Sequence, residues 1–434
     1  MKICMIGTGY VGLVSGTCFA DIGNQVFCVD NNADKINKLN SGVSTIYEPG
    51  LDELIQKNYK AKRLFFTTNL KKAITLSDII FICVGTPNIK GSLKVNLSFV
   101  YKCIKQILSI ATKKKIIVTK STVPVGTGDE IEKILEKKKK LFSVLSNPEF
   151  LREGEAIRDF RYPDRIVVGS NNKNDFKLMK KLYEPLTNKG SMFFTTTRRG
   201  AELIKYAANA FLATKITFIN EIANLCEQSG INVEDIALGI GSDTRIGGRF
   251  LRAGPAYGGS CFPKDTKGLV SVAEKHKINL SIVKSVIKSN QDRANLLIKR
   301  VHKILGNNLK GKKISVLGVT FKPNTDDMRD STSLKMLPYL CKKGAIINYY
   351  DPSGEKNAFK KLVNCKFKNN IRENCLNTDL IILLTEWDEF KSIDFKNVVK
   401  KKNFKIYDLR NIYTRDEMKR NKIKYYSIGR PDTN

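Results

Sequence analysis

The glycine-rich segment Gly7–Gly12 constrains the fold of this chain more than any other feature. It follows an apolar run at residues 2–6 and precedes an apolar helical stretch at residues 11–22, and a second strand-like run covers residues 25–30. A Gly-x-Gly-x-x-Gly turn between a strand and a helix lets main-chain amides approach a ligand at the helix N-terminus. The segment therefore predicts a βαβ unit, the alternative being a tight turn that binds nothing.

Further strand-like runs end in polar, Gly or Pro residues at 78–84, 116–119, 143–146 and 165–169. A long helical pattern at 201–228 closes at Ser229-Gly230, and a second strand-first module follows with strands at 312–319, 345–350, 379–384 and 404–409 and a helix near 334–343. Alternating strands and helices predict parallel, doubly wound sheets. We therefore expect an α/β protein with two Rossmann-like domains, 1–198 and 309–434, joined by a central helical domain, 199–308.

The composition narrows the classes of protein that need to be considered. Lysine and arginine number 75 against 42 acidic residues, a formal charge of +33, so nucleic-acid binding is an alternative to weigh. The lysines are spread along the chain without an aromatic-interleaved stripe, which favours an ordinary solvated surface and no nucleic-acid partner. No apolar run approaches the roughly 18 residues of a membrane span, and no signal peptide is evident. We expect a cytoplasmic protein without membrane association.

The ten cysteines are scattered, and none forms a Cys-x-x-Cys pair. Most are expected to be reduced, buried small hydrophobes. Without paired Cys and His spacing we expect no metal site, and only two histidines are present.

Asp30 ends the strand that follows the glycine-rich turn, 18 residues after Gly12. A carboxylate at this place accepts hydrogen bonds from ribose hydroxyls and repels a 2′-phosphate. Asn31 and Asn32 follow, with no adjacent arginine. The pattern therefore predicts NAD as the cofactor, in preference to NADP.

Cys261 lies in the glycine-rich turn Gly258–Asp265, between Ser260 and a nearby cation, Lys264. A nearby lysine favours the thiolate, which is the nucleophilic form. Cys261 is the one cysteine with such neighbours, and we interpret it as a nucleophile. An ordinary turn cysteine is the competing interpretation of the octapeptide taken alone.

Two polar pairs could assist such chemistry. Lys205 and Asn209 are four residues apart on the long helix and share one face, so together they could polarise one oxygen. Glu149 and Glu153 follow a strand end, where ligands bind in doubly wound sheets. A solvated helix face and acidic charge at a helix N-terminus are the respective alternatives.

Together these pieces resemble the UDP-glucose/GDP-mannose dehydrogenase family over essentially the whole chain. The most specific segments are Gly7–Gly12, Val84–Pro87, Ser121–Thr127, Asn147–Gly154, Glu202–Leu212, Phe250–Asp265 and Phe321–Arg329. The resemblance implies two successive NAD-dependent oxidations at the sugar C6, through a thiohemiacetal and then a thioester on the cysteine, which water hydrolyses.

The resemblance also implies roles for individual residues. The implied nucleophile is Cys261, and the implied general acid/base is Glu149. Lys205 and Asn209 would stabilise oxyanions, and Asp265 and Thr122 would position or activate water. The implied NAD contacts are Gly7, Gly9, Tyr10, Val11, Gly12, Asp30, Lys35, Thr86, Thr122, Glu153, Lys264 and Arg329. The implied nucleotide-sugar contacts are Glu149, Phe150, Leu151, Arg152, Glu153, Lys205, Asn209, Arg245, Phe250, Leu251, Arg252, Ala253, Gly254, Gly258 and Lys322, with Arg410 as a further substrate residue.

The family forms dimers through the central helix, so a homodimer or higher homo-oligomer is expected, with Arg245 reaching the partner's site. Ala256 stands where UDP-glucose enzymes usually have Gly and GDP-mannose enzymes often have Ala. Phe262, Pro323 and the segment Arg245–Gly247 resemble the UDP-glucose branch. We therefore predict oxidation of UDP-glucose to UDP-glucuronate for polysaccharide precursors, with GDP-mannose oxidation as the alternative. A single-step β-hydroxyacid dehydrogenase leaves Cys261 unexplained.

Overall fold

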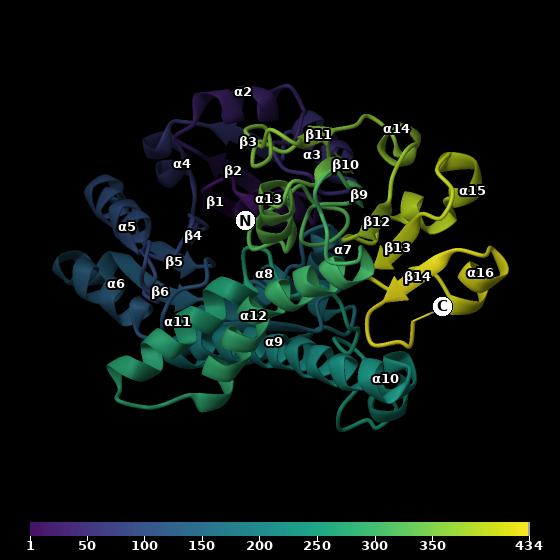
Figure 1. Cartoon of the computed structure of the whole chain (residues 1–434). Coiled ribbons are helices and arrows are strands. Elements are labelled where there is room, and N and C mark those ends of the chain that lie inside the picture. Colours follow the sequence, from purple (N-terminus) through teal and green to yellow (C-terminus); the bar gives the residue numbers. More distant parts are fainter. Residues whose placement is uncertain (433–434) are drawn as a thin grey trace. The chain divides into compact units, whose positions relative to one another are not determined.

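The computed structural model describes residues 1–432. Their contacts divide into two compact units: unit 1 comprises Met1–Ala208 and Lys267–Asn279, and unit 2 comprises Asn209–Thr266 and the residues from Leu280 onward. Each unit contains one β-sheet. The long helix α9 (Arg198–Ser229), labelled in Figure 1, begins in unit 1 and continues into unit 2.

The sheet of unit 1 has the strand order β3-β2-β1-β4-β5-β6-β7-β8. Its strands are β1 (Lys2–Ile6), β2 (Gln25–Val29), β3 (Leu64–Thr67), β4 (Ile79–Ile82), β5 (Lys115–Thr119), β6 (Phe142–Ser146), β7 (Arg165–Gly169) and β8 (Met192–Thr196). The pairs are parallel except at β6 and β7, which meet in antiparallel fashion through Ser146 and Gly169 only. The predicted doubly wound sheet is thus confirmed. The parallel pair β7 and β8 extends this sheet and runs antiparallel to β6.

Alternate residues of the central strand β1 pack on opposite faces of this sheet. Ile3 and Met5 contact one apolar cluster, and Cys4 and Ile6 contact another. The first face is covered by α1 (Tyr10–Asp21), α2 (Ala33–Asn40), α3 (Leu51–Lys60), α7 (Ala156–Arg161) and α8 (Lys173–Thr187). The second is covered by α4 (Leu70–Leu76), α5 (Ser98–Ile110) and α6 (Thr127–Leu135), after which η1 (Glu136–Leu141) leads into β6. A sheet buried on both faces explains the continuous apolar strands seen in the sequence.

The sheet of unit 2 repeats the order of the first six strands of unit 1, as β11-β10-β9-β12-β13-β14, and every pair is parallel. Its strands are β9 (Lys313–Leu317), β10 (Ile346–Tyr350), β11 (Cys365–Phe367), β12 (Leu380–Leu383), β13 (Lys405–Asp408) and β14 (Lys424–Ser427). One apolar cluster joins this sheet with parts of α9, α12 (Ser281–Ile304) and α13 (Ser333–Lys342). A second apolar cluster joins the sheet with α14 (Ile371–Cys375), η2 (Asp388–Ser392), α15 (Phe395–Val398) and α16 (Arg415–Arg420). Two further helices are α10 (Val233–Gly241) and α11 (Phe262–Lys275). Both predicted Rossmann-like sheets are confirmed.

Four strands, β3, β8, β11 and β14, were not predicted from the sequence, and they are the four edge strands of the two sheets. Each of them is only partly buried, and β8 contains no buried residue, whereas β4 and β12 are buried throughout. A short edge strand carries a weaker apolar signal than a central one because one side of it faces no neighbouring strand.

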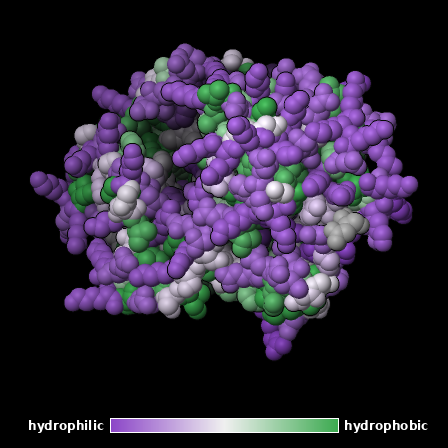
Figure 2. All heavy atoms as spheres, in the orientation of Figure 1, coloured by the Kyte–Doolittle hydropathy of each residue, from purple (hydrophilic) through white to green (hydrophobic). Residues whose placement is uncertain are grey.

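The visible face of the molecule is mostly hydrophilic, in keeping with the excess of basic residues (Figure 2). None of the helices formed by residues 1–432 is long and apolar enough to cross a membrane.

Candidate active site

The turn between β1 and α1 has room for a ligand only at its middle glycine. Gly7 has φ +101°, and a Cβ at Gly12 would lie 1.9 Å from the Gly7 carbonyl oxygen, so both positions require glycine. A Cβ at Gly9 would meet no heavy atom of the described chain within 4 Å. Among residues 1–432 no side chain caps the N-terminus of α1. The open space at Gly9 and the helix N-terminus together suit a pyrophosphate.

Asp30 lies beside this turn at the end of β2. Its Oδ2 accepts hydrogen bonds from the Thr8 amide at 3.0 Å and the Thr8 hydroxyl at 2.8 Å, and its Oδ1 accepts one from the Asn32 amide. Burial raises the pKa of Asp30, but these hydrogen bonds outweigh it and the pKa is lowered. The carboxylate is only half-buried. It is therefore ionised and able to accept ribose hydroxyls, so the residues present fit NAD.

Glu48, which the sequence gave no reason to single out, connects this turn with the segment Asn147–Gly154. It is buried and accepts a hydrogen bond from the Tyr10 hydroxyl. The Gly154 amide donates to both Glu48 Oε2 and the Tyr10 oxygen at 2.6 Å, and the Ala156 amide donates to Glu48 at 2.7 Å. Burial raises the pKa of Tyr10. Tyr10 and Glu48 thus hold the start of α1 and the loop after β6 together.

Glu149 and Lys205 form a buried ion pair in unit 1. Glu149 Oε1 lies 3.1 Å from Lys205 Nζ, and both side chains are at most 4% exposed. Glu149 Oε2 accepts the Leu151 amide at 2.5 Å, and Lys205 Nζ lies 5.1 Å from the Phe150 ring centre. A buried pair at the carboxyl edge of a doubly wound sheet can hold or pass a proton. The structure thus brings these sequence-predicted residues together, which excludes a solvated helix face for Lys205.

Glu202, one turn before Lys205 on α9, holds the loop after β5. Its carboxylate accepts the Gly126 amide at 2.7 Å, the Gly128 amide at 2.8 Å and the Ser146 hydroxyl at 3.1 Å. Burial raises the pKa of Glu202 to about 7, against the effect of these hydrogen bonds. In the same loop Thr122 accepts the Thr86 hydroxyl at 2.8 Å through its carbonyl oxygen. Thr86 and Thr122, both predicted NAD contacts, therefore lie side by side.

Lys120 is a second buried lysine that the sequence did not single out. Its Nζ donates to Asn147 Oδ1 at 3.2 Å and to the Tyr183 hydroxyl at 3.3 Å. Burial lowers the pKa of Lys120 to about 8. Because Asn147 begins the segment with Glu149 and Glu153, Lys120 ties that segment to the loop after β5. The signal in the sequence that could have found Lys120 is a basic residue directly after an apolar strand.

In unit 2, Cys261 directly precedes α11 and is partly exposed, whereas eight of the ten free cysteines are buried. The Asp265 amide donates to the Cys261 carbonyl at 2.8 Å, so Cys261 stands at the cap position of the helix. The positive end of a helix dipole favours a thiolate there. Its Sγ lies 3.4 Å from the Ser260 hydroxyl.

The turn before Cys261 packs closely against the segment Phe321–Arg329. A Cβ at Gly258 would lie 2.7 Å from the Asp330 carbonyl oxygen, and a Cβ at Gly259 would lie 2.6 Å from the Phe321 ring. The Gly259 amide donates to the Arg329 carbonyl at 2.7 Å. Only glycine permits this approach, which joins two of the predicted motifs.

Asp265 is fully buried and organises the side chains around the first turn of α11. Its Oδ2 accepts the Asn209 side-chain amide at 2.6 Å, and its Oδ1 accepts Lys264 Nζ at 2.5 Å. The Asn209 amide nitrogen carries a second hydrogen, which this bond leaves for an acceptor such as an oxyanion. The predicted set Asn209, Lys264 and Asp265 is therefore one connected group.

The side chains of the segment Phe250–Gly254 differ in their burial. Leu251 and Ala253 are buried in the core of unit 2, and Arg252 is exposed, donating to the Arg410 carbonyl at 2.7 Å. Phe250 has φ +65°, a conformation that bulky residues adopt only under constraint. A Cβ at Gly254 would lie 3.3 Å from Arg410 Nη1, so Gly254 and Arg410, both predicted substrate residues, are neighbours.

Other predicted residues lie nearer the surface. Arg245 is 88% exposed and pairs with Asp243, and Arg329 is 63% exposed and pairs with Asp327. Lys322 Nζ lies 5.7 Å from the Phe321 ring centre. Lys35 and Arg152 lie in unit 1, and the side chain of Arg152 bonds Asp159.

The predicted site residues divide between the two units. Unit 1 contains the glycine-rich turn with Val11, Asp30, Lys35, Thr86, Thr122, the segment Glu149–Glu153 and Lys205, and unit 2 contains Asn209, Arg245, Phe250–Gly254, Gly258, Cys261, Lys264, Asp265, Lys322, Arg329 and Arg410. Cofactor-binding features therefore concentrate in unit 1, and the thiol lies in unit 2.

Three successive parts of the chain match the three domains of one protein family. Residues 1–187 match the NAD-binding domain of the UDP-glucose/GDP-mannose dehydrogenase family, residues 199–292 its central domain and residues 315–415 its UDP-binding domain. The chain belongs to this family. The resemblance and the NAD cofactor predicted from the sequence are confirmed, and the chain is an NAD-dependent oxidoreductase by family.

Curated relatives match over nearly their whole length. The chain is 48% identical to UDP-glucose 6-dehydrogenase of Rhizobium meliloti (strain 1021), covering 100% of both chains. It is 43% identical to UDP-glucose 6-dehydrogenase TuaD of Bacillus subtilis (strain 168), covering 99% of this chain and 93% of that one. Among solved structures, a UDP-glucose dehydrogenase of Pyrobaculum islandicum has a TM-score of 0.90 at 31% identity, covering 99% and 97% of the two chains.

Proposed function

We propose that this family member oxidises UDP-glucose at C6 to UDP-glucuronate in two NAD-dependent steps. The observation that carries the proposal is the partly exposed thiol of Cys261 at the N-terminus of α11, beside the connected group Asn209, Lys264 and Asp265. The UDP-binding domain match and the names of the curated relatives support UDP-glucose as the substrate.

In the first step the alcohol becomes an aldehyde. Bound NAD, held at the Gly7–Gly12 turn and Asp30, supplies a hydride acceptor for each oxidation. The alcohol proton passes to the Glu149 and Lys205 pair, whose atoms are 3.1 Å apart and shielded from water. Lys205 and Asn209 stabilise the negative charge that develops on the sugar oxygen.

In the second step the Cys261 thiolate adds to the aldehyde carbon and forms a thiohemiacetal. Loss of a hydride from that carbon gives a thioester, and water, positioned by Asp265, displaces the thiolate and leaves the carboxylate. One sugar therefore yields two NADH. Covalent capture keeps the reactive aldehyde from leaving the enzyme.

An assay of NADH formation with UDP-glucose, GDP-mannose and UDP-N-acetylmannosamine tests the proposal. We expect UDP-glucose to react with the highest kcat/KM and to give two NADH for each sugar consumed. Cys261→Ala should abolish carboxylate formation. One NADH per sugar with released aldehyde, or undiminished carboxylate formation by Cys261→Ala, would overturn the thioester route, and a preference for GDP-mannose would overturn the substrate.

We also propose that the chain forms a homodimer through α9 and works in the cytoplasm, where its soluble cofactor is found. The helix exposes Phe211, Phe218 and Leu225 at seven-residue spacing, and they are 65%, 50% and 62% exposed. An apolar stripe at this spacing supports helix-to-helix association. Sedimentation of Phe218→Glu should show monomers if the stripe is the interface, and dimers of this variant would place the interface elsewhere.

A further inference from the structure

The segment Leu251–Ser260 of unit 2 has neither helix nor strand, and most of its residues, including Gly254 and Tyr257, are buried. Buried main-chain amides and carbonyls need hydrogen-bond partners, and irregular chain cannot supply them from a ladder. In this segment side chains of α9 and α12, which lie side by side, supply them (Figure 1).

Both the main-chain amide and the main-chain carbonyl of Gly254 are bonded to buried side chains. Its amide donates to Asn220 Oδ1 at 2.8 Å, and its carbonyl accepts Arg293 Nε at 2.7 Å. Asn220 is 2% exposed and Arg293 5% exposed. Arg293 Nη1 also donates to the Asn220 carbonyl at 3.2 Å and to Asn224 Oδ1 at 3.3 Å, which ties α12 to α9. Gly254 is thereby fixed in two directions.

Asn290 holds Tyr257 in the same manner. Its Oδ1 accepts the Tyr257 amide at 2.9 Å, and its Nδ2 donates to the Tyr257 carbonyl at 3.0 Å. This pair of bonds needs one acceptor and one donor on the same side chain, which a carboxamide provides. The Tyr257 side chain packs with Ala213, Val286 and Phe262. Cys261 follows Tyr257 by four residues.

We propose that Asn220, Asn290 and Arg293 are positioning residues that set the main chain of the nucleotide-sugar segment and, through it, the turn that carries Cys261. The inference rests on the proposed function for its substrate. Because Gly254 adjoins Arg410 and the Gly258-Gly259 turn packs on Phe321, a shift of the segment displaces the sugar and the thiol together. Small displacements of reacting groups lower rates steeply.

The experiment compares Asn290→Ala, Asn290→Asp, Arg293→Ala and Arg293→Lys in the full chain. We expect at least a tenfold rise in KM for UDP-glucose, a fall in kcat, and a KM for NAD within about twofold of the wild-type value. Asn290→Asp keeps the acceptor for the Tyr257 amide but repels its carbonyl, so it should resemble Asn290→Ala. Arg293→Lys keeps one donor for the Gly254 carbonyl and should recover part of the loss.

A groove of about 370 Å³, lined by Asn220, Asn290 and Arg293 among others, gives small molecules a route to this place. Methylguanidinium added to Arg293→Ala should therefore lower its KM for the sugar, which a general loss of folding would not allow. Asp292→Ala, an exposed residue of the same groove, is the matched control and should behave as wild type.

The rate at which iodoacetamide alkylates Cys261, followed by mass spectrometry, is a readout that needs no substrate. We expect it to change at least threefold in the Asn290 and Arg293 variants and not in Asp292→Ala. Variants that fold with the wild-type Tm, sugar KM and alkylation rate would overturn the inference. If the wild type fails to oxidise UDP-glucose, the proposed function falls, whereas the alkylation rates still decide the positioning role.

Discussion

The two sheets of this protein share the order of their first six strands, and in each an aspartate follows the second strand, yet the two aspartates differ in what they can bind. Asp30 accepts hydrogen bonds from Thr8 and from the Asn32 amide, and it remains half-buried. Asp351 is 1% exposed. One of its oxygens accepts the Val319 amide at 2.7 Å, and the other accepts the Ser353 hydroxyl and amide.

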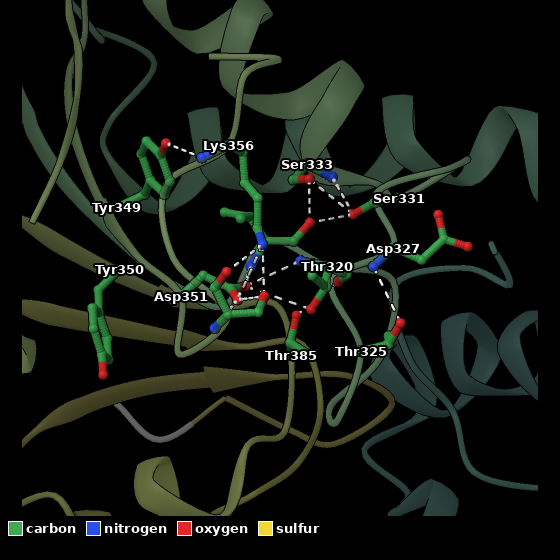
Figure 3. Close-up of polar contacts among 12 residues, drawn as sticks. Thr320, Thr325, Asp327, Ser331, Ser333, Tyr349, Tyr350, Asp351, Lys356 and Thr385 are labelled. Atoms are coloured by element: carbon green, nitrogen blue, oxygen red, sulfur yellow. Dashed lines mark hydrogen bonds and ion pairs between the residues drawn. The ribbon is translucent and has the colours of Figure 1, made fainter. Parts of the chain in front are cut away.

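Figure 3 shows Asp351 surrounded by side chains of its own unit, including Thr320 and Lys356. Lys356 Nζ lies 3.8 Å from Asp351 and donates to the Ser353 hydroxyl at 2.6 Å. Side chains of the chain itself thus cover Asp351, whereas Asp30 stays open enough to accept a ligand.

The loops after the first strands differ as well. Gly7 and Gly318 both have positive φ, and each donates its amide to the last residue of the neighbouring strand at 2.8 Å. After Gly7 the helix α1 begins at Tyr10, whereas after Gly318 the helix α13 begins only at Ser333. A helix N-terminus near the glycine turn is what a pyrophosphate needs. Strand order alone therefore does not make a dinucleotide site.

The strongest test of this comparison is a side chain placed in the open space at Gly9. Gly9→Leu should fold with nearly the wild-type Tm because a Cβ there meets no heavy atom within 4 Å. It should lower NAD affinity at least a hundredfold, measured by calorimetry, because the side chain fills the pyrophosphate position. Thr320→Val, at the equivalent place in unit 2, should leave NAD affinity unchanged. Equal NAD binding by Gly9→Leu and the wild type would place the cofactor elsewhere.

Asp351→Asn should affect stability and leave the cofactor alone. The side-chain amide of the new asparagine places an N–H donor against the Val319 or the Ser353 main-chain amide, which is itself a donor. Because this leaves a buried polar group without an acceptor, the free energy of unfolding should fall by about 3 kcal/mol. Urea unfolding measures the loss, and NAD affinity should stay within twofold. A variant as stable as the wild type would show that Asp351 is no structural anchor.

Asp30→Asn should show the opposite behaviour. The half-buried side chain loses its charge and part of its acceptor capacity, so NAD affinity should fall about tenfold, roughly 1.4 kcal/mol. The affinity for NADP relative to NAD should rise, because the repulsion of a 2′-phosphate is removed. The loss of unfolding free energy should be smaller than that of Asp351→Asn, because the half-buried group stays in contact with water. An unchanged ratio of the two affinities would remove Asp30 from cofactor selection.

Lys120 and Lys356, two of the buried lysines, offer a smaller test. Burial lowers the pKa of Lys120 from 10.5 to about 8, and it lowers that of Lys356 despite nearby Asp351. Between pH 8 and pH 10.5 the unfolded chain binds more protons at Lys120 than the folded chain, so stability should rise with pH across this window. Lys120→Met should remove about 1 kcal/mol of that rise between pH 8 and pH 9.5.

Lys356→Met should remove less of the rise, and urea unfolding at each pH measures both. Parallel stability curves for Lys120→Met and the wild type would show that Lys120 does not titrate in this window.

Local pattern was sufficient to predict much of the fold and many candidate residues. The βαβ start with Asp30, the long helix and both sheets followed from apolar periodicity and glycine placement, because these signals lie within a few adjacent residues. The edge strands were missed because their apolar signal is short. Glu48, Lys120 and Asn220 were also missed, since each acts on main chain or side chains far along the sequence.

By itself, the sequence determined the family, the cofactor and the two Rossmann sheets, because glycine, strand and helix signals are local and survive without knowledge of contacts. Only the tertiary structure decided which of two similar aspartates stays open to a ligand, and which buried polar groups hold the segment before Cys261. Those outcomes depend on hydrogen bonds between residues from 20 to more than 100 positions apart, such as Asp351 with Val319 and Glu48 with Gly154. No periodicity along the chain records such pairings.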